Sequence, residues 1–423
     1  MTYDDVVVAE PTRLWTRERK VGAVLVASGI AATVGFGALA TGEDARFTLT
    51  EDPTGPAVAI NGMVGAILFG LVAVAAGGAL FVPAARRWFA WLLGVAIVGV
   101  VLSFLCWQIS AAPPNLNFMP LVDIVRGTFL FALPLIFGAL AGVLCERSGV
   151  VNVAIEGQLL TGAFAGALLG SIAASVWAGL IGGILGGMLI SALLAWFSIR
   201  YLVDQVVLGV VLNLFAIGLT GFIYEQLMRP NASQYNQPPR FPVWELPLLS
   251  DIPVIGPAIF TGNLFLFLGL ALVVVLNVAL FRTRWGLRTR SVGEHPAAAD
   301  TVGVKVLRLR YRNVLLAGAV AGIGGAYFTL GLVGQFGKNM VGGKGFIALA
   351  ALIFGRWSPT GALFAALFFG FADKLSGYLA GIASPIPSEF LAMLPYLATV
   401  LAVAGLVGRV RAPAADGKPY IKG

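Results

Sequence analysis

The sequence predicts an all-α, polytopic membrane protein with about 10–12 transmembrane helices. Of its 423 residues, 58% are hydrophobic and only 11% are charged, too few polar side chains to cover a soluble domain of this size. Apolar runs recur along the whole chain, and roughly 20 such residues cross a bilayer as a helix. Short segments of alternating polarity, the signature of a β-barrel, are absent.

Twelve candidate spans follow from these runs. The first is preceded by four basic residues, Arg13, Arg17, Arg19 and Lys20. Because the apolar run is long and no clear small-residue cleavage site follows it, we expect a retained helix rather than a signal peptide. The spans are 21–40, 57–82, 88–110, 124–144, 149–170, 176–199, 205–228, 261–281, 313–333, 345–357, 359–380 and 389–408. The span 345–357 is short, and 149–170 is a candidate for a broken helix.

Basic residues in the loops predict the orientation, because Lys and Arg stay on the cytoplasmic side. The acidic loop "TGEDARFTLTEDPTG" after the first span is predicted to be external. Arg86 and Arg87 then mark an inner turn. Counting onward places 282–312 and the basic tail 411–423 inside, together with the N-terminus.

Glycine is frequent, with 54 residues, and much of it has helical spacing, as in "GGILGG" at 182–187 and "GAVAG" at 318–322. Small residues four apart let helices approach closely in lipid, so tight packing is expected. In addition, "TGAFAGALLG" at 161–170 resembles "TGALFAALFFG" at 360–370. Each follows a polar or Gly-rich break, which predicts interrupted segments and a possible internal repeat.

The stretch 145–162, "CERSGVVNVAIEGQLLTG", is polar between two apolar runs. Glu146 and Arg147 are predicted at the inner surface. Glu156 lies about ten residues deeper, near mid-membrane in a regular helix, and Gly149 and Gly157 are positioned to interrupt that helix. Two interpretations stay open: Glu156 pairs with a buried cation or caps a broken helix, or it lines a solute pathway.

The other candidate pathway residues are polar groups in the same region or in a neighbouring span. Asn152 and Gln158 flank Glu156, and Asn213 lies within 205–228, where it would bond a neighbouring helix or a solute hydroxyl. Asp373 and Lys374 are interpreted as a solvated pair.

The loop 282–312 carries eight Lys or Arg against two acids, a net +6 of the chain's +8. Within it, Pro296 suits the first position of a helix and Gly303 a C-terminal stop. A helix of about two turns is not stable alone. Binding to anionic lipid explains the charge, but the Ala-rich helix favours docking on a partner protein.

Three motifs together resemble the permease subunits of ABC-type nucleoside importers, relatives of the ribose and branched-chain amino-acid permeases. They are "ERSGVVNVAIEGQLLTGAF", "SVGEHPAAADTVGVKVLRLRY" and "GKGFIALAALIFGRWSPTGAL". The resemblance covers about 120–410. It implies an N-terminal extension (1–115) with about three helices, a permease core (116–410), a cytoplasmic coupling loop (282–312) and a cytoplasmic tail (411–423), in a bacterial plasma (inner) membrane.

The resemblance also implies an ATPase-coupling helix within 294–303. Its general pattern, E-A-A-x-x-x-G, is matched by Ala298, Ala299 and Gly303, while Ala297 stands where the Glu would be. A salt bridge made by that Glu would have to come from Glu294 or Asp300. The full set of coupling candidates is Glu294, Pro296, Ala298, Ala299, Asp300 and Gly303.

The implied partners are cytoplasmic ATPase subunits, a second permease subunit that is the same or a related chain, and an extracytoplasmic substrate-binding lipoprotein. No G-x-x-x-x-G-K-[ST] motif occurs, so no cofactor is expected on this chain and ATP is expected to be used by the partner ATPase. One histidine and two cysteines, Cys106 and Cys145, predict no metal site and no disulfide framework. No catalytic residue is expected.

Three classes of function are compared. An ATP-driven importer of a small neutral polar solute is favoured, with a nucleoside as the expected substrate. An ion-coupled secondary transporter would place several acids or a His in the membrane, whereas Glu156 is the only deep acid expected. A non-transporting scaffold is disfavoured by the two interrupted segments.

Overall fold

The computed structural model describes residues 16–50, 52, 55–253, 256–382, 384–393, 396 and 411–422. The chain divides into two compact units. Unit 1 comprises Met1–Pro120 with Tyr378–Pro387, and unit 2 comprises Leu121–Gly377 with Ser388–Gly423. Each unit has its own hydrophobic core.

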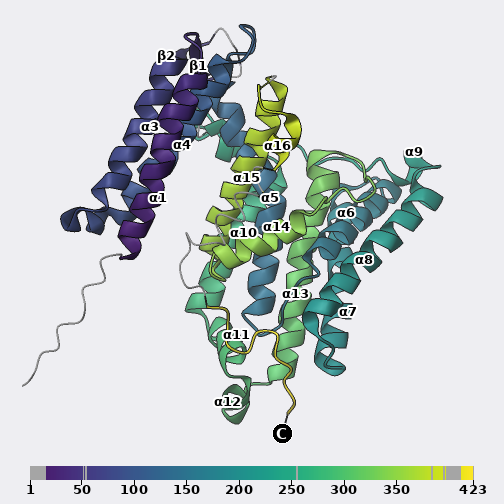
Figure 1. The fold of residues 1–423 in the computed structure, drawn as a ribbon. Coiled ribbons are helices and arrows are strands. Elements are labelled where there is room, and N and C mark those ends of the chain that lie inside the picture. Colours follow the sequence, from purple (N-terminus) through teal and green to yellow (C-terminus); the bar gives the residue numbers. More distant parts are fainter. Residues whose placement is uncertain are drawn as a thin grey trace, which may run out of the picture. The chain divides into compact units, whose positions relative to one another are not determined.

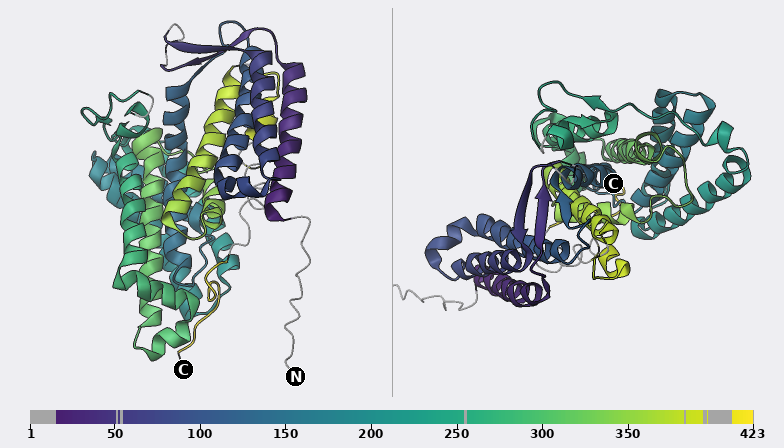
Figure 2. Two further views of the ribbon diagram at one scale, coloured as in Figure 1. Left: turned by 90° about the vertical axis from the view of Figure 1, so that its left-hand side faces the viewer. Right: turned by 90° about the horizontal axis from the view of Figure 1, so that it is seen from above.

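Unit 1 is built on three long helices beside a small sheet. Thr16 and Asn61 cap the first and second of these helices, each accepting a backbone N–H with its side chain, which satisfies donors that a helix start leaves free. The strands lie at one end of the helices (Figure 2). The elements are α1 (Arg17–Ala31), η1 (Ala32–Phe36), α2 (Gly37–Leu39), β1 (Asp44–Thr48), β2 (Ala57–Asn61), α3 (Gly62–Ala79), η2 (Pro83–Trp88), α4 (Phe89–Ser110) and β3 (Phe118–Pro120).

Unit 2 is a helical bundle around α5, in which every residue from Ala132 to Glu146 is buried. Figure 1 shows α5 and α13 in the middle of this unit, with α6, α7 and α8 beside them. Its elements are α5 (Leu121–Glu146), α6 (Ile155–Ile172), α7 (Val176–Ala195), η3 (Trp196–Arg200), α8 (Gln205–Ile223), η4 (Tyr224–Met228), α9 (Ala232–Tyr235), β4 (Trp244–Glu245), η5 (Gly256–Phe260), β5 (Thr261–Gly262), α10 (Leu264–Arg282), α11 (Arg284–Glu294), α12 (Pro296–Thr301), α13 (Val306–Tyr327), η6 (Phe328–Leu332), α14 (Lys344–Phe354), α15 (Pro359–Gly381) and α16 (Ser388–Ala392).

Close helix contacts follow from the predicted glycine spacing. A Cβ on Gly187 of α7 would lie 2.3 Å from the carbonyl oxygen of Gly318 on α13, and one on Gly322 would lie 2.3 Å from the carbonyl oxygen of Gly183. Only glycine permits this distance between two helix backbones, because the neighbouring atoms are main chain and cannot rotate away.

The predicted fold class is confirmed: ten helices of the described residues are long and apolar enough to cross a membrane. Several boundaries differ from the prediction. The first five residues of the predicted span 57–82 form β2, and the span 313–333 begins earlier, at Val306. Residues 345–357 do not form a crossing, because α14 has 11 residues, about 16 Å of helix. The predicted span 389–408 lies largely outside the described residues.

Candidate functional site: a broken segment, a capped half-helix and a docking loop

The first part of the site is an irregular segment, residues 147–154, between α5 and α6. Gly149 turns it with a φ of +83°, which a residue with a Cβ rarely adopts. The predicted break in the span 149–170 is confirmed at its start, since residues 149–154 are not helical and α6 begins at Ile155. Gly157 does not interrupt the helix; it lies within α6.

Side chains from α8 hold this segment. Val151 N–H donates to Gln205 Oε1 at 2.7 Å. Asn213 bonds both the segment and the first turn of α6, donating to the Val153 carbonyl at 2.9 Å and accepting from Gly157 N–H at 2.8 Å. Irregular backbone inside a membrane protein needs such internal partners, because lipid offers none. Asn213 thus makes the bond to a neighbouring helix that was one of its two predicted roles.

Asn152 and Gln158 form a closed pair. Asn152 Nδ2 donates to Gln158 Oε1 at 3.1 Å, and Gln158 Nε2 donates to Asn152 Oδ1 at 3.0 Å and to Ser191 Oγ at 2.9 Å. Both amide side chains are fully buried. In this conformation they join the segment to α6 and α7, and the pathway role expected for them stays a prediction.

Glu156 caps α14. Its Oε1 accepts from Gly343 N–H at 2.8 Å and its Oε2 from Gly345 N–H at 2.7 Å. These amides belong to the first turn of the helix, where donors lack helical partners and a negative charge is favoured. A Cβ on Gly345 would lie 2.4 Å from Glu156 N, so the close approach requires glycine. The structure thus shows the capping contact, one of the two interpretations left open for Glu156.

Two ion pairs lie beyond this cap. Lys344 Nζ is 2.6 Å from Asp373 Oδ2, and Lys374 Nζ is 2.7 Å from Asp123 Oδ2. The predicted pairing of Asp373 with Lys374 is therefore wrong, because consecutive residues on a helix point about 100° apart. The expectation that Glu156 is the only deep acid is also wrong, because Asp373 lies within the membrane-length helix α15.

Glu146 is buried, with only 3% of it exposed, and its place at the inner surface of the membrane stays a prediction. Its Oε2 accepts from Trp357 Nε1, and its Oε1 from Asn152 N–H at 3.5 Å. The C-terminal tail supplies a third contact, a hydrogen bond with the carboxyl group of Asp416. This contact could not be predicted from sequence, because Glu146 and Asp416 are 270 positions apart.

The tail, residues 411–422, runs beside α11 and the start of α13 (Figure 1). Ala415 N–H donates to the Gly293 carbonyl at 2.8 Å, and buried Arg310 donates to the carbonyls of Lys418 and Ser148, both at 3.1 Å. The tail therefore lies on the same face of unit 2 as the loop that follows α10.

That loop contains the predicted short helix, α12, with Pro296 at its first position and Gly303 just beyond its end at a φ of +85°. The rest of the loop is more helical than expected: 284–294 form α11, and 306–312 belong to α13. Helices as short as α11 and α12 are stabilised by packing against the rest of the protein rather than by intrinsic helix propensity.

The six coupling candidates differ in their surroundings. Ala298 and Gly303 are exposed, whereas Ala299 is buried against Val292 and Val306. Three others face the tail or stand at the helix start: Glu294 accepts from Ala414 N–H at 3.2 Å, Asp300 hydrogen-bonds Tyr420, and Pro296 is half-buried.

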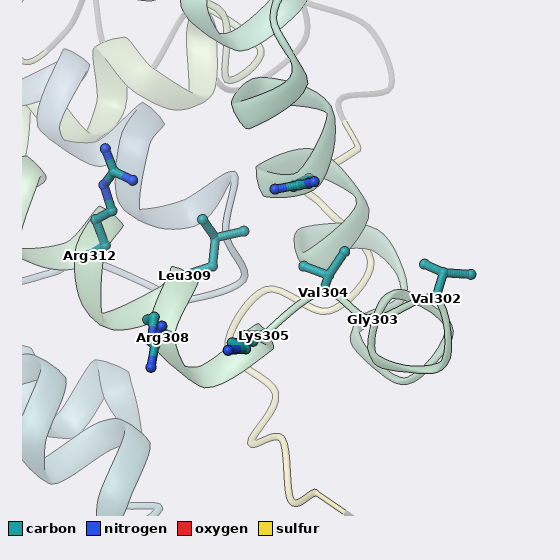
Figure 3. Close-up of a pocket in the computed structure, with 8 residues that line it drawn as sticks. Val302, Gly303, Val304, Lys305, Arg308, Leu309 and Arg312 are labelled. Atoms are coloured by element: carbon teal, nitrogen blue, oxygen red, sulfur yellow. The ribbon is translucent and has the colours of Figure 1, made fainter.

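A basic pocket of about 320 Å³ opens beside α12. Figure 3 shows Lys305, Arg308 and Arg312 along the start of α13, with Val302 and Val304 across the pocket. Arg288 of α11 completes the set of four cations, and none of the eight lining residues is acidic. The pocket suits an anionic surface or group.

Long apolar helices, an irregular segment held by buried side chains and an exposed helix at one face together define a multi-pass membrane protein. The family model described as the permease component of the branched-chain amino acid transport system matches residues 124–406. The chain belongs to this family. Among the described residues, no group of His, Cys, Asp and Glu is arranged to hold a metal ion.

Three curated relatives illustrate the similarity. The guanosine ABC transporter permease protein NupQ of Bacillus subtilis is 43% identical over 71% of this chain and 97% of its own length. The nucleoside ABC transporter permease protein NupC of Lactococcus lactis is 40% identical over 71% and 96%. A putative glucose ABC transporter permease protein of Haloferax volcanii is 31% identical over 66% and 89%. No solved structure matches.

Proposed function

We propose that this chain is the transmembrane subunit of an ATP-driven importer that carries a nucleoside across the plasma membrane. The observation that carries the proposal is the similarity to guanosine and nucleoside permeases over nearly their whole length. The glucose permease is less similar, which favours a nucleoside over a sugar. The chain itself is a transporter subunit and not an enzyme.

We further propose that ATP is hydrolysed by separate cytoplasmic ATPase subunits that dock on α12, and that this chain binds no cofactor. The exposed Ala298 and Gly303 offer a small-residue surface for a groove, and the adjacent basic pocket would meet an acidic part of the ATPase. A second permease subunit and an extracytoplasmic substrate-binding lipoprotein complete the complex. The docking loop and both termini would then be cytoplasmic.

Uptake into cells that lack nucleoside carriers tests this function. Cells producing the complete system should accumulate radiolabelled guanosine, and unlabelled nucleosides should compete more strongly than glucose. Uptake should follow internal ATP and persist with an ionophore present. Loss of uptake with the ionophore while ATP stays high would instead identify an ion-coupled carrier, and glucose outcompeting nucleosides would overturn the substrate.

Purification tests the partners. The tagged chain, solubilised in mild detergent from its native membrane, should co-elute with an ATPase subunit, which mass spectrometry would identify. Elution without any ATPase, from preparations that retain uptake activity before solubilisation, would contradict the proposed complex.

A further inference from the structure

The ion pair between Lys344 and Asp373 joins the start of α14 to α15, away from the ends of the membrane-length helices beside it. Asp373 is eight residues before the Gly381 end of α15 (381 minus 373), roughly 12 Å along the helix. The Lys344 ammonium lies 5.6 Å from the ring centre of Phe131, ten residues into α5 (131 minus 121), or about 15 Å. Both helices therefore place the pair well inside a hydrocarbon region about 30 Å thick.

This pair is not sealed within the protein. The Lys344 and Asp373 side chains are 23% and 34% exposed, whereas Glu156, which caps the same half-helix, is 3% exposed. Charged groups at this depth face protein or water and avoid lipid. Other residues of this chain leave part of each side chain exposed. The surface that carries the pair therefore cannot be an ordinary lipid-facing surface.

The opposite face of α15 has the character expected for lipid. Phe364 is nine residues before Asp373, which corresponds to about half a turn around the helix, and 70% of it is exposed. On the side of the ion pair, one turn beyond Asp373, a Cβ on Gly377 would meet nothing within 4 Å. One face of α15 thus exposes Phe364 and is apolar. The opposite face carries the partly exposed Asp373, with open space beside Gly377.

We propose that the Lys344–Asp373 pair lines the aqueous route through the permease and binds the passing solute, a neutral molecule rich in hydroxyl groups with an aromatic ring. This inference rests on the proposed function. One donor of the ammonium is used on Asp373, and an ammonium has three, so the pair offers donors and acceptors to a neutral solute without losing its counterion. Phe131 adds an aromatic surface.

Cysteine labelling tests whether this face is wet. Gly377→Cys leaves the ion pair intact and places a thiol beside it, and Phe364→Cys is the matched control on the opposite face of the same helix. The native Cys106 and Cys145 are buried, so the parent chain gives the background. A membrane-impermeant methanethiosulfonate reagent should modify Gly377→Cys at least about tenfold faster than Phe364→Cys. Equal rates would overturn the proposal, because the face would then contact lipid or another chain.

Solute protection tests whether the route passes the pair. Guanosine at saturating concentration should slow the labelling of Gly377→Cys several-fold and leave Phe364→Cys unchanged. Asp373→Cys, labelled directly at the pair, should behave in the same way. If the parent takes up guanosine but guanosine protects neither position, the route lies elsewhere. If the parent takes up no guanosine, the proposed substrate fails, while the labelling ratio still decides whether the face is wet.

Discussion

At the scale of single residues, Glu156 joins the start of α6 to the start of α14. Glu156→Leu leaves the Gly343 and Gly345 amides without their acceptor, and each unpaired buried donor costs about 1–3 kcal/mol. Glu156→Gln keeps one acceptor but turns an NH₂ group toward the other donor. At matched membrane levels, we therefore expect uptake to be highest in the wild type, lower in Glu156→Gln and lowest in Glu156→Leu, with the ATPase still bound to all three. Equal inactivity of both variants would favour a proton-coupled carrier, because neutral Gln cannot cycle a proton.

Gly187 tests the helix contact. Gly187→Ala places a methyl group 2.3 Å from the Gly318 carbonyl oxygen, and overpacking of this kind costs about 1–3 kcal/mol. The midpoint of thermal unfolding in detergent should fall. Gly218→Ala on α8 is the control, since nothing lies within 4 Å of its Cβ and alanine favours a helix by about 0.5–1 kcal/mol. A similar fall in the unfolding midpoint of both variants would show that the close contact between α7 and α13 is not what requires glycine at this position.

At the scale of elements, α12 is predicted to be the ATPase-docking helix. A side chain at Gly303 meets no atom of this chain within 4 Å, so Gly303→Trp would project into the docking surface. The left-handed backbone there adds strain of about 1–2 kcal/mol. Co-purification of the ATPase should be lost while membrane insertion persists. Asparagine tolerates this backbone conformation, so Gly303→Asn should retain the ATPase. Normal co-purification of the ATPase with Gly303→Trp would rule out α12 as the docking helix.

The tail is predicted to detach from the loop as the pH rises. Burial raises the pKa of Asp416 from 3.8 to about 8, and the facing Glu146 carboxyl group adds to the shift. Between about pH 4 and pH 8, Asp416 of the docked tail therefore holds a proton that Asp416 of a free tail would release. Docking should be strongest below about pH 4 and weaken until the pH passes about 8. Hydrogen exchange of residues 411–422, corrected for intrinsic rates, should be faster at pH 8.5 than at pH 6.5. Asp416→Asn should reduce this difference, and an unchanged difference would contradict the prediction.

The helices and their glycine contacts could be predicted from sequence because they depend on local composition and spacing, as in "GGILGG" on α7. The polar stretch around Glu156 was recognisable for the same reason. Its partners were not, since Gly343, Gly345 and Asn213 come from distant parts of the chain. The burial of Glu146 was not predictable either, because the tail that covers it comes from the far end of the chain.

At the scale of the whole molecule, the two hydrophobic cores are separate. The large core runs from Ala132 to Phe369, and the core of unit 1 is built around Leu25, Ala73 and Ala96. The family match begins at 124. We propose, on this basis, that the N-terminal extension is accessory to transport.

Deletion of residues 1–108 tests this proposal. It removes unit 1's own core but no residue of the large core, so the truncated chain should still insert and retain part of its guanosine uptake. Tyr378 and Ser384 contact Phe118 and Gln108 within unit 1, and the deletion removes Gln108. Some loss of expression is therefore expected, and uptake must be normalised to the amount of chain in the membrane. The control is the same truncation carrying Glu156→Leu, which should transport less than the truncation alone. A well-inserted truncation with no uptake would show that the N-terminal helices take part in transport, because the core that remains contains every residue to which we assign a role.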